Sequence, residues 1–112
     1  MANDARDERV GLNEAVFREV NERIENLTEK FDLRGSPLDL VCECADSTCI
    51  ERITMRHSEY EEVRSDARQF VVSPGHVDEA IEAVVAQRPG YYVVRKRDPQ
   101  AVAVAEATDR RS

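Results

Sequence analysis

Residues 38–55 have the sequence LDLVCECADSTCIERITM, and this stretch decides how the chain folds around it. Apolar and polar side chains alternate from residue 38 to residue 44, which predicts a strand with Cys42 and Cys44 on one face. Residues 45–48 are turn-forming, and residues 50–55 predict a second short strand. The chain's three cysteines, the third of which follows the turn, therefore bracket a hairpin-like loop.

The spacing Cys42-x-Cys44-x4-Cys49, with His76 on a later turn, predicts a metal site. Structural zinc takes four nitrogen or sulfur ligands in a tetrahedron, and three cysteines with one histidine are a common set. The segment Ser-Pro-Gly-His at 73–76 suits a type II turn that places His76 at its exit. We therefore predict zinc held by these four side chains, with closed coordination that stabilises the fold and leaves no catalytic position.

Other interpretations of the cysteines stay open. Free cysteine is among the most buried residue types, so the thiols could be inert core side chains. His57 is the substitute fourth ligand. A zinc–thiol redox sensor and a small enzyme with a catalytic thiol are further alternatives. The compact iron–sulfur motif does not fit, because Ile-Glu-Arg-Ile follows Cys49 where that motif has its histidine.

Residues 10–31 predict a long amphipathic helix without proline. Its a and d heptad positions are Val10, Asn13, Phe17, Val20, Ile24, Leu27 and Phe31. We favour an interpretation in which this stripe lies across a sheet of the same chain, since three heptads fall short of a usual coiled coil. The alternative is that the face formed by Val10, Phe17, Val20, Ile24 and Leu27 binds a protein partner or a second copy. We expect residues 1–9 to be frayed.

The remaining segments predict further short elements. These are a helix over 58–66, strands over 69–72, 78–87 and 91–96, and a helix over 101–108. Ser58 and Glu61 form a capping box at the start of the first helix. Residues 78–87 also fit a helix, but the Pro89-Gly90 turn before the next strand favours a hairpin.

Together these elements predict a single α+β domain over residues 10–112. Its long N-terminal helix, 10–31, packs on a small antiparallel sheet with a short inserted helix. The sheet and the metal site occupy 38–97, and a short helix and tail follow over 98–112. Because a chain of 112 residues has a thin core, we expect zinc to staple the fold.

The composition narrows the range of functions. With 16 basic and 23 acidic side chains, the net charge of −7 argues against a nucleic-acid partner. No apolar run approaches the roughly 20 residues that span a bilayer, and the polar N-terminus is no secretory signal, so we expect a cytoplasmic protein with no membrane partner. Phosphate-binding loops and nucleophile elbows are missing from the sequence. We therefore expect a non-catalytic zinc-binding module that serves protein binding or regulation.

Three segments also resemble one group of proteins. The segments are Val41–Cys44 with Cys49, Ser58–Arg64 and Phe70–His76, and they resemble a group of small actinobacterial proteins of unassigned activity. The resemblance extends over residues 6–98. A bias of 14 arginines to 2 lysines is compatible with a GC-rich genome. The resemblance implies that the cysteines and the Pro-Gly-His turn belong to one unit, and it implies no activity.

Overall fold

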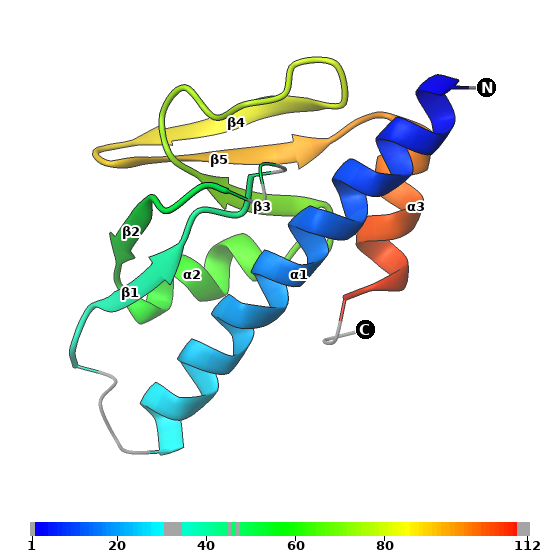
Figure 1. Ribbon diagram of the computed structural model, residues 1–112. Helices are drawn as coiled ribbons and strands as arrows, with labels where there is room; N and C mark the ends of the chain where they lie inside the picture. Colours follow the sequence, from blue (N-terminus) through cyan, green and yellow to red (C-terminus); the bar gives the residue numbers. More distant parts are fainter. Residues whose placement is uncertain (1, 31–34, 45, 47, 110–112) are drawn as a thin grey trace.

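A computed structural model describes residues 2–30, 35–44, 46 and 48–109, with side chains from residue 14 onward, and it shows an α+β fold (Figure 1). The predicted long N-terminal helix, antiparallel strands and short inserted helix are confirmed. The helices are α1 (Ala2–Lys30), α2 (His57–Arg64) and α3 (Pro99–Ala107). The strands are β1 (Leu38–Val41), β2 (Arg52–Met55), β3 (Gln69–Val72), β4 (Glu82–Arg88) and β5 (Tyr91–Lys96).

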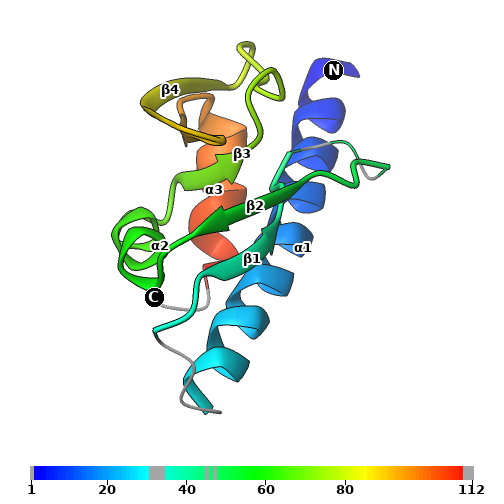
Figure 2. The ribbon, with the colours of Figure 1, turned by 90° about the vertical axis from the view of Figure 1, so that its left-hand side faces the viewer.

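Helix α1 runs the length of the molecule, with α3 and β1 beside it (Figures 1 and 2). It begins at Ala2, eight residues before the start that the sequence predicts, so it includes residues 2–9, which the sequence analysis expects to be frayed. Lys30 in the last turn complements the helix dipole. The predicted stripe position Phe31 lies outside the described residues, as do the side chains of Val10 and Asn13. None of the described helices has the length and apolar content needed to cross a membrane.

The five strands form two antiparallel sheets, where the sequence predicts one. Strands β1 and β2 make a hairpin in which Leu38 pairs with Met55, and the second sheet has the order β3-β5-β4. Glu43 explains the separation. Its backbone N–H donates to the carbonyl of Val71 at 2.8 Å, while its carboxylate accepts from the N–H of Val71 at 3.0 Å. The Glu43 carboxylate thus takes the place of the main-chain carbonyl that a paired strand would offer to Val71. The two sheets therefore lie side by side but do not form one continuous sheet.

The hairpin interpretation of residues 78–87 is confirmed, since β4 pairs with β5. Gly90 has a φ of 87°, which a type II turn requires at that position. A register shift between Val84 and Ala86 marks a bulge. The carbonyl of Asp78 accepts from the N–H groups of Ile81 and Glu82, so a turn precedes the strand and delays its start to Glu82.

The caps of the two short helices differ from the predicted ones. Helix α2 begins at His57, and the Glu59 carboxylate accepts from the N–H of Arg56 at 2.8 Å, in place of the predicted box of Ser58 and Glu61. Helix α3 begins two residues before the predicted start. The Asp98 carboxylate accepts from the N–H groups of Gln100 and Ala101, and Pro99 in the first turn has no N–H that needs an acceptor.

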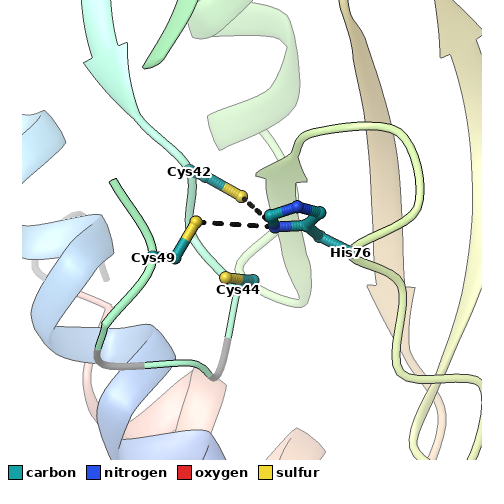
Figure 3. A group of neighbouring side chains, drawn as sticks. All are labelled: Cys42, Cys44, Cys49 and His76. Carbon is teal, nitrogen blue, oxygen red and sulfur yellow. Dashed lines mark hydrogen bonds between the residues drawn. The ribbon is translucent and has the colours of Figure 1, made fainter. Parts of the chain in front are cut away.

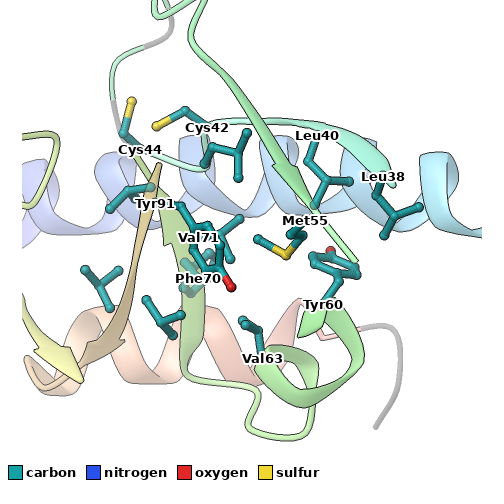
Figure 4. Close-up of a cluster of buried hydrophobic side chains, with 14 of the residues drawn as sticks. Leu38, Leu40, Cys42, Cys44, Met55, Tyr60, Val63, Phe70, Val71 and Tyr91 are labelled. Atoms are coloured by element: carbon teal, nitrogen blue, oxygen red, sulfur yellow. The ribbon is translucent and has the colours of Figure 1, made fainter. Parts of the chain in front are cut away.

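The apolar core lies between the two sheets and α2 (Figure 4). Strands of both sheets contribute side chains to it, and α2 closes it from one side. Its fully buried members are Leu38, Leu40, Ile53, Tyr60, Phe70, Val71, Val72 and Val94. Cys42 and Cys44 lie at the edge of the same cluster, which places the thiols where the two sheets meet.

Helix α1 packs on this unit with polar side chains, so the favoured interpretation of its apolar stripe is wrong. Its buried residues are Glu14, Arg18, Asn21, Glu22 and Glu25. On the opposite side, Val16 is 60% exposed, Leu27 54% and Val20 38%. Phe17 and Ile24 lie between the two faces and are half-buried.

Specific partners account for this polar packing. The Arg18 guanidinium donates to the carbonyls of Ala67 and Ala105 at 2.6 and 2.8 Å and lies over the ring of Phe70. The Asn21 amide exchanges two 2.8 Å hydrogen bonds with the backbone of Val41, as a neighbouring strand would. Buried polar groups are tolerated when their hydrogen bonds are made, so these contacts fix the rotation of the helix.

Candidate metal centre

The structure brings together the four predicted ligands, Cys42, Cys44, Cys49 and His76 (Figure 3). The first two directly follow β1, Cys49 precedes β2, and His76 follows β3. Their sulfur and nitrogen ligand atoms all lie within 4.8 Å of one another. The cluster is close enough to bind a metal ion, and it would connect the first sheet with the second.

The distances in the cluster match the edges of a coordination tetrahedron. Nδ1 of His76 lies 3.6 Å from Sγ of Cys42 and 3.5 Å from Sγ of Cys49. With Zn–S bonds of about 2.3 Å and Zn–N bonds of about 2.0–2.1 Å, a tetrahedral S–N edge is about 3.5–3.6 Å. A single ring nitrogen carries at most one proton to share between the two sulfurs. Metal coordination accounts for both distances at once.

Backbone contacts hold the cysteines in place. The N–H of Ser73 donates to Sγ of Cys42 at 3.2 Å, a contact of the kind that orients and stabilises a metal-bound thiolate. The carboxylate of Asp46 accepts from the N–H and hydroxyl of Thr48, and these hydrogen bonds lower the pKa of Asp46. The N–H of Cys49 donates to the Asp46 carbonyl at 3.1 Å. This tight turn directs Cys49 back toward the other two thiols.

The predicted type II turn positions the histidine. The N–H of His76 donates to the carbonyl of Ser73 at 3.0 Å, and Gly75 has a φ of 88°. A residue with a Cβ is strained at that angle, so glycine is needed there. Gly90 occupies the equivalent place in the β4–β5 turn with a φ of 87°, far from any predicted ligand in the sequence.

This pair of glycines gives a matched prediction. An alanine Cβ at either position meets nothing within 4 Å, so the penalty is backbone strain of about 1–2 kcal/mol. Strain at residue 75 should also shift His76, so we expect any metal affinity of the cluster to fall about tenfold in Gly75→Ala. Gly90→Ala should lose similar stability and keep its metal affinity. Urea unfolding measures the stability of each variant, and competition with a chromophoric chelator measures its affinity for added Zn²⁺. An equal loss of metal affinity in both variants would contradict the assignment of His76.

Burial sets the protonation of the thiols. Cys42 is 3% exposed and Cys44 4%, and burial raises the pKa of both, that of Cys44 to about 12. Without a cation these two thiols are therefore neutral at pH 7. A metal ion reverses this preference, because it binds the thiolates and displaces their protons. Cys49 and His76 are half-buried, and His76 lines a shallow surface hollow together with Cys44, which gives an ion a route to the cluster.

His57, the substitute ligand, lies in a different group. Its Nε2 is 3.0 Å from a carboxylate oxygen of Glu29 and 3.3 Å from one of Glu25. The sequence interpretation considers His57 only as a substitute ligand for the cysteine cluster. The signal it missed is the i, i+4 spacing of Glu25 with Glu29 and of His57 with Glu61, which places each pair on one helix face.

The fold and the cluster define a class of protein: a small α+β domain with a thiol-rich group able to bind a metal ion. No protein-family model, curated protein or solved structure matches the chain. The function is therefore argued from the geometry of the described residues.

Proposed function

We propose that this chain is a non-catalytic zinc-binding module. One zinc ion on Cys42, Cys44, Cys49 and His76 fastens the β1–β2 hairpin to the turn after β3. The agreement between the 3.5 and 3.6 Å sulfur–nitrogen distances and a tetrahedral edge carries the proposal. Soft thiolates favour zinc among common divalent ions, and four protein ligands leave no position for a reacting water. Free thiols of this kind suit the reducing cytoplasm.

Native mass spectrometry of protein purified without added metal tests the proposal. We expect a mass excess of one zinc per chain that is lost on acid denaturation, with elemental analysis to identify the ion. A folded protein at its apo mass, with three thiols that all react freely, would overturn it.

The pH dependence of zinc binding follows from the raised pKa values of Cys42 and Cys44. Binding displaces a proton from each of these thiols, so a lower pH opposes binding. We expect the apparent zinc affinity to rise at least about 100-fold for each pH unit between 6 and 8, since these two thiols alone release two protons. Competition titrations at several pH values measure the slope. An affinity independent of pH would exclude these thiols as ligands.

A zinc–thiol redox sensor is the second candidate, and the half-buried position of Cys49 favours it. Peroxide would take two electrons from Cys49 and one neighbouring thiolate; a disulfide forms, peroxide is reduced to water, and the zinc is released. Mild peroxide should then release the metal reversibly. Retention of zinc under the same treatment would argue against the sensor and favour a purely structural zinc. A catalytic thiol, the third alternative, predicts one cysteine that reacts far faster than free cysteine.

We also propose that the exposed face of α1 binds a second copy of this chain. The face comprises Val16, Val20 and Leu27, and the hollow beside it is mainly apolar. Glu19 and Arg23 lie along its edge with opposite charges. In an antiparallel pair of helices, Glu19 of one copy faces Arg23 of the other, which favours self-association.

Sedimentation equilibrium tests this face. We expect Leu27→Asp to weaken the dimer at least tenfold while the chain stays folded, because the side chain contacts little within one copy. Val85→Asp is the matched control, since Val85 is 50% exposed on β4 and lies away from the helix. A wild-type chain that stays monomeric at high concentration, or equal effects of both variants, would refute the dimer.

A further inference from the structure

A second group of ligand side chains lies between α1 and α2. Glu25 and Glu29 are one turn apart on α1, and His57 and Glu61 are one turn apart on α2. Each helix therefore presents two ligands on one face. One carboxylate oxygen of each glutamate and one imidazole nitrogen all lie within 4.8 Å of one another.

The two helices hold these side chains in a fixed relation. Arg64, at the end of α2, binds Glu22 of α1 at 2.5 Å, while His57, at the start of α2, contacts Glu25 and Glu29. The helices are thus joined at both ends of α2 and run antiparallel. The rigid helical backbone, rather than a loop, sets the positions of all four ligands.

The distances and charges of the group suit a cation. Nε2 of His57 lies 3.0 and 3.3 Å from oxygens of Glu29 and Glu25, and metal–ligand bonds of about 2.0–2.2 Å give octahedral edges of about 2.8–3.1 Å and tetrahedral edges of about 3.3–3.6 Å. Three carboxylates and one imidazole nitrogen are a donor set that binds divalent cations. The Glu25 side chain is 2% exposed, so this donor is held inside the protein and not on a mobile surface side chain.

The donor set differs in kind from the cysteine cluster. Carboxylate oxygens favour harder ions such as Mn²⁺, and one imidazole adds affinity for first-row transition metals. Thiolates bind zinc more strongly than carboxylates do, so we expect zinc to prefer the cysteine cluster and a harder ion to prefer the carboxylate group. A hollow lined by Gly35, Pro37, Arg56 and His57 opens beside the group and gives an ion access from solvent.

We infer that Glu25, Glu29, His57 and Glu61 form a second metal site, which binds a divalent first-row cation such as Mn²⁺ and clamps α1 to the start of α2. The site is independent of the thiol cluster, because the two share no ligand.

Titration of the zinc-loaded chain with Mn²⁺, followed by the electron paramagnetic resonance signal of the free ion, tests this inference. We expect one saturable Mn²⁺ site per chain. Glu61→Gln and Glu29→Gln should each weaken binding about tenfold or more. Glu62→Gln is the matched control, because it removes the same charge from the next, exposed residue of α2 and should leave the affinity unchanged.

The zinc content and circular dichroism of each variant show whether the cysteine cluster is loaded and whether the chain is folded. A loss of Mn²⁺ binding can then be distinguished from a failure of the proposed zinc site. Glu29 has a side chain 38% exposed, so its substitution leaves folding intact and keeps the test decisive even if His57 variants unfold. Absence of saturable Mn²⁺ binding, or equal binding by Glu61→Gln and Glu62→Gln, would overturn the inference. The four side chains would then form an ion-pair cluster alone.

Discussion

Cys42→Ser is expected to unfold the domain. The variant loses a proposed metal ligand that also forms part of the core edge, since Cys42 is 3% exposed. Structural zinc contributes on the order of 10 kcal/mol in small zinc-binding domains, which is comparable with the about 5–15 kcal/mol of net stability of a whole domain. Loss of most of that contribution leaves the hairpin joined to the second sheet by the shared apolar core and by the hydrogen bonds between Glu43 and Val71.

Circular dichroism and urea unfolding measure this effect, and a chelator supplies its control. If the proposed zinc is bound, a strong chelator removes it from the wild-type chain without any change of side chain, so it should reproduce most of the destabilisation. If the thiols are inert core groups, the chelator has no effect. The serine substitution then costs only about 1–3 kcal/mol, the usual penalty for a poorly satisfied buried polar group.

Local patterns predicted the strands and turns well, because each depends on residues close in sequence. Residues 69–72 form β3 as predicted, and the two Pro-Gly turns carry the expected positive φ angles. The split into two sheets was not predictable, since it depends on the contact between Glu43 and Val71, 28 residues apart. The register of one strand against another is set by such distant contacts.

The orientation of α1 shows why periodicity alone was insufficient. The heptad pattern correctly predicted a helix and an apolar face, but not which face packs inward. That choice depends on partners for Arg18 and Asn21 that lie in α3 and β1. Polar side chains with distant partners leave no periodic signal, so the sequence favoured the wrong face.

The two candidate metal groups differ in the same way. Three cysteines within eight residues, with a turn that presents His76, gave a local signal for the first. The second group takes one pair of ligands from α1 and another pair from α2. Glu29 of the first pair and His57 of the second are 28 residues apart in the sequence. The i, i+4 spacing of each pair is common in helices and does not by itself indicate a metal site. Only the packing of the helices, which Arg64 and Glu22 help to fix, unites them.

Lys96→Met is expected to destabilise the chain by about 3–5 kcal/mol, the usual result of removing one partner from a buried ionic group. The ammonium group is 1% exposed, binds both Glu14 and Glu82, and lies 4.9 Å from the centre of the Phe70 ring. Methionine fills much of the same volume but leaves two carboxylates buried together without their cation.

Arg95→Met is the matched control for this substitution. Arg95 is the preceding residue of β5 and binds Asp66 at 2.8 Å, but its side chain is 44% exposed. Surface ion pairs contribute only about 0–1 kcal/mol, so urea unfolding should show a small loss. Comparable losses for the two variants would contradict the assigned role of Lys96.

The pH dependence of the Lys96→Met effect identifies its cause. Burial raises the pKa of Glu14 to about 8, so the folded wild-type chain retains a proton there that the unfolded chain loses above its ordinary value of 4.5. This group's contribution to the free energy of unfolding therefore falls as the pH rises between those values. Without the lysine, ionisation of Glu14 is opposed further, so the destabilisation should grow as the pH rises past about 8. Replacing both glutamates by glutamine alongside Lys96→Met removes the buried charge, so it should restore most of the stability and abolish this dependence. A loss that stays constant with pH would instead point to altered packing around Phe70.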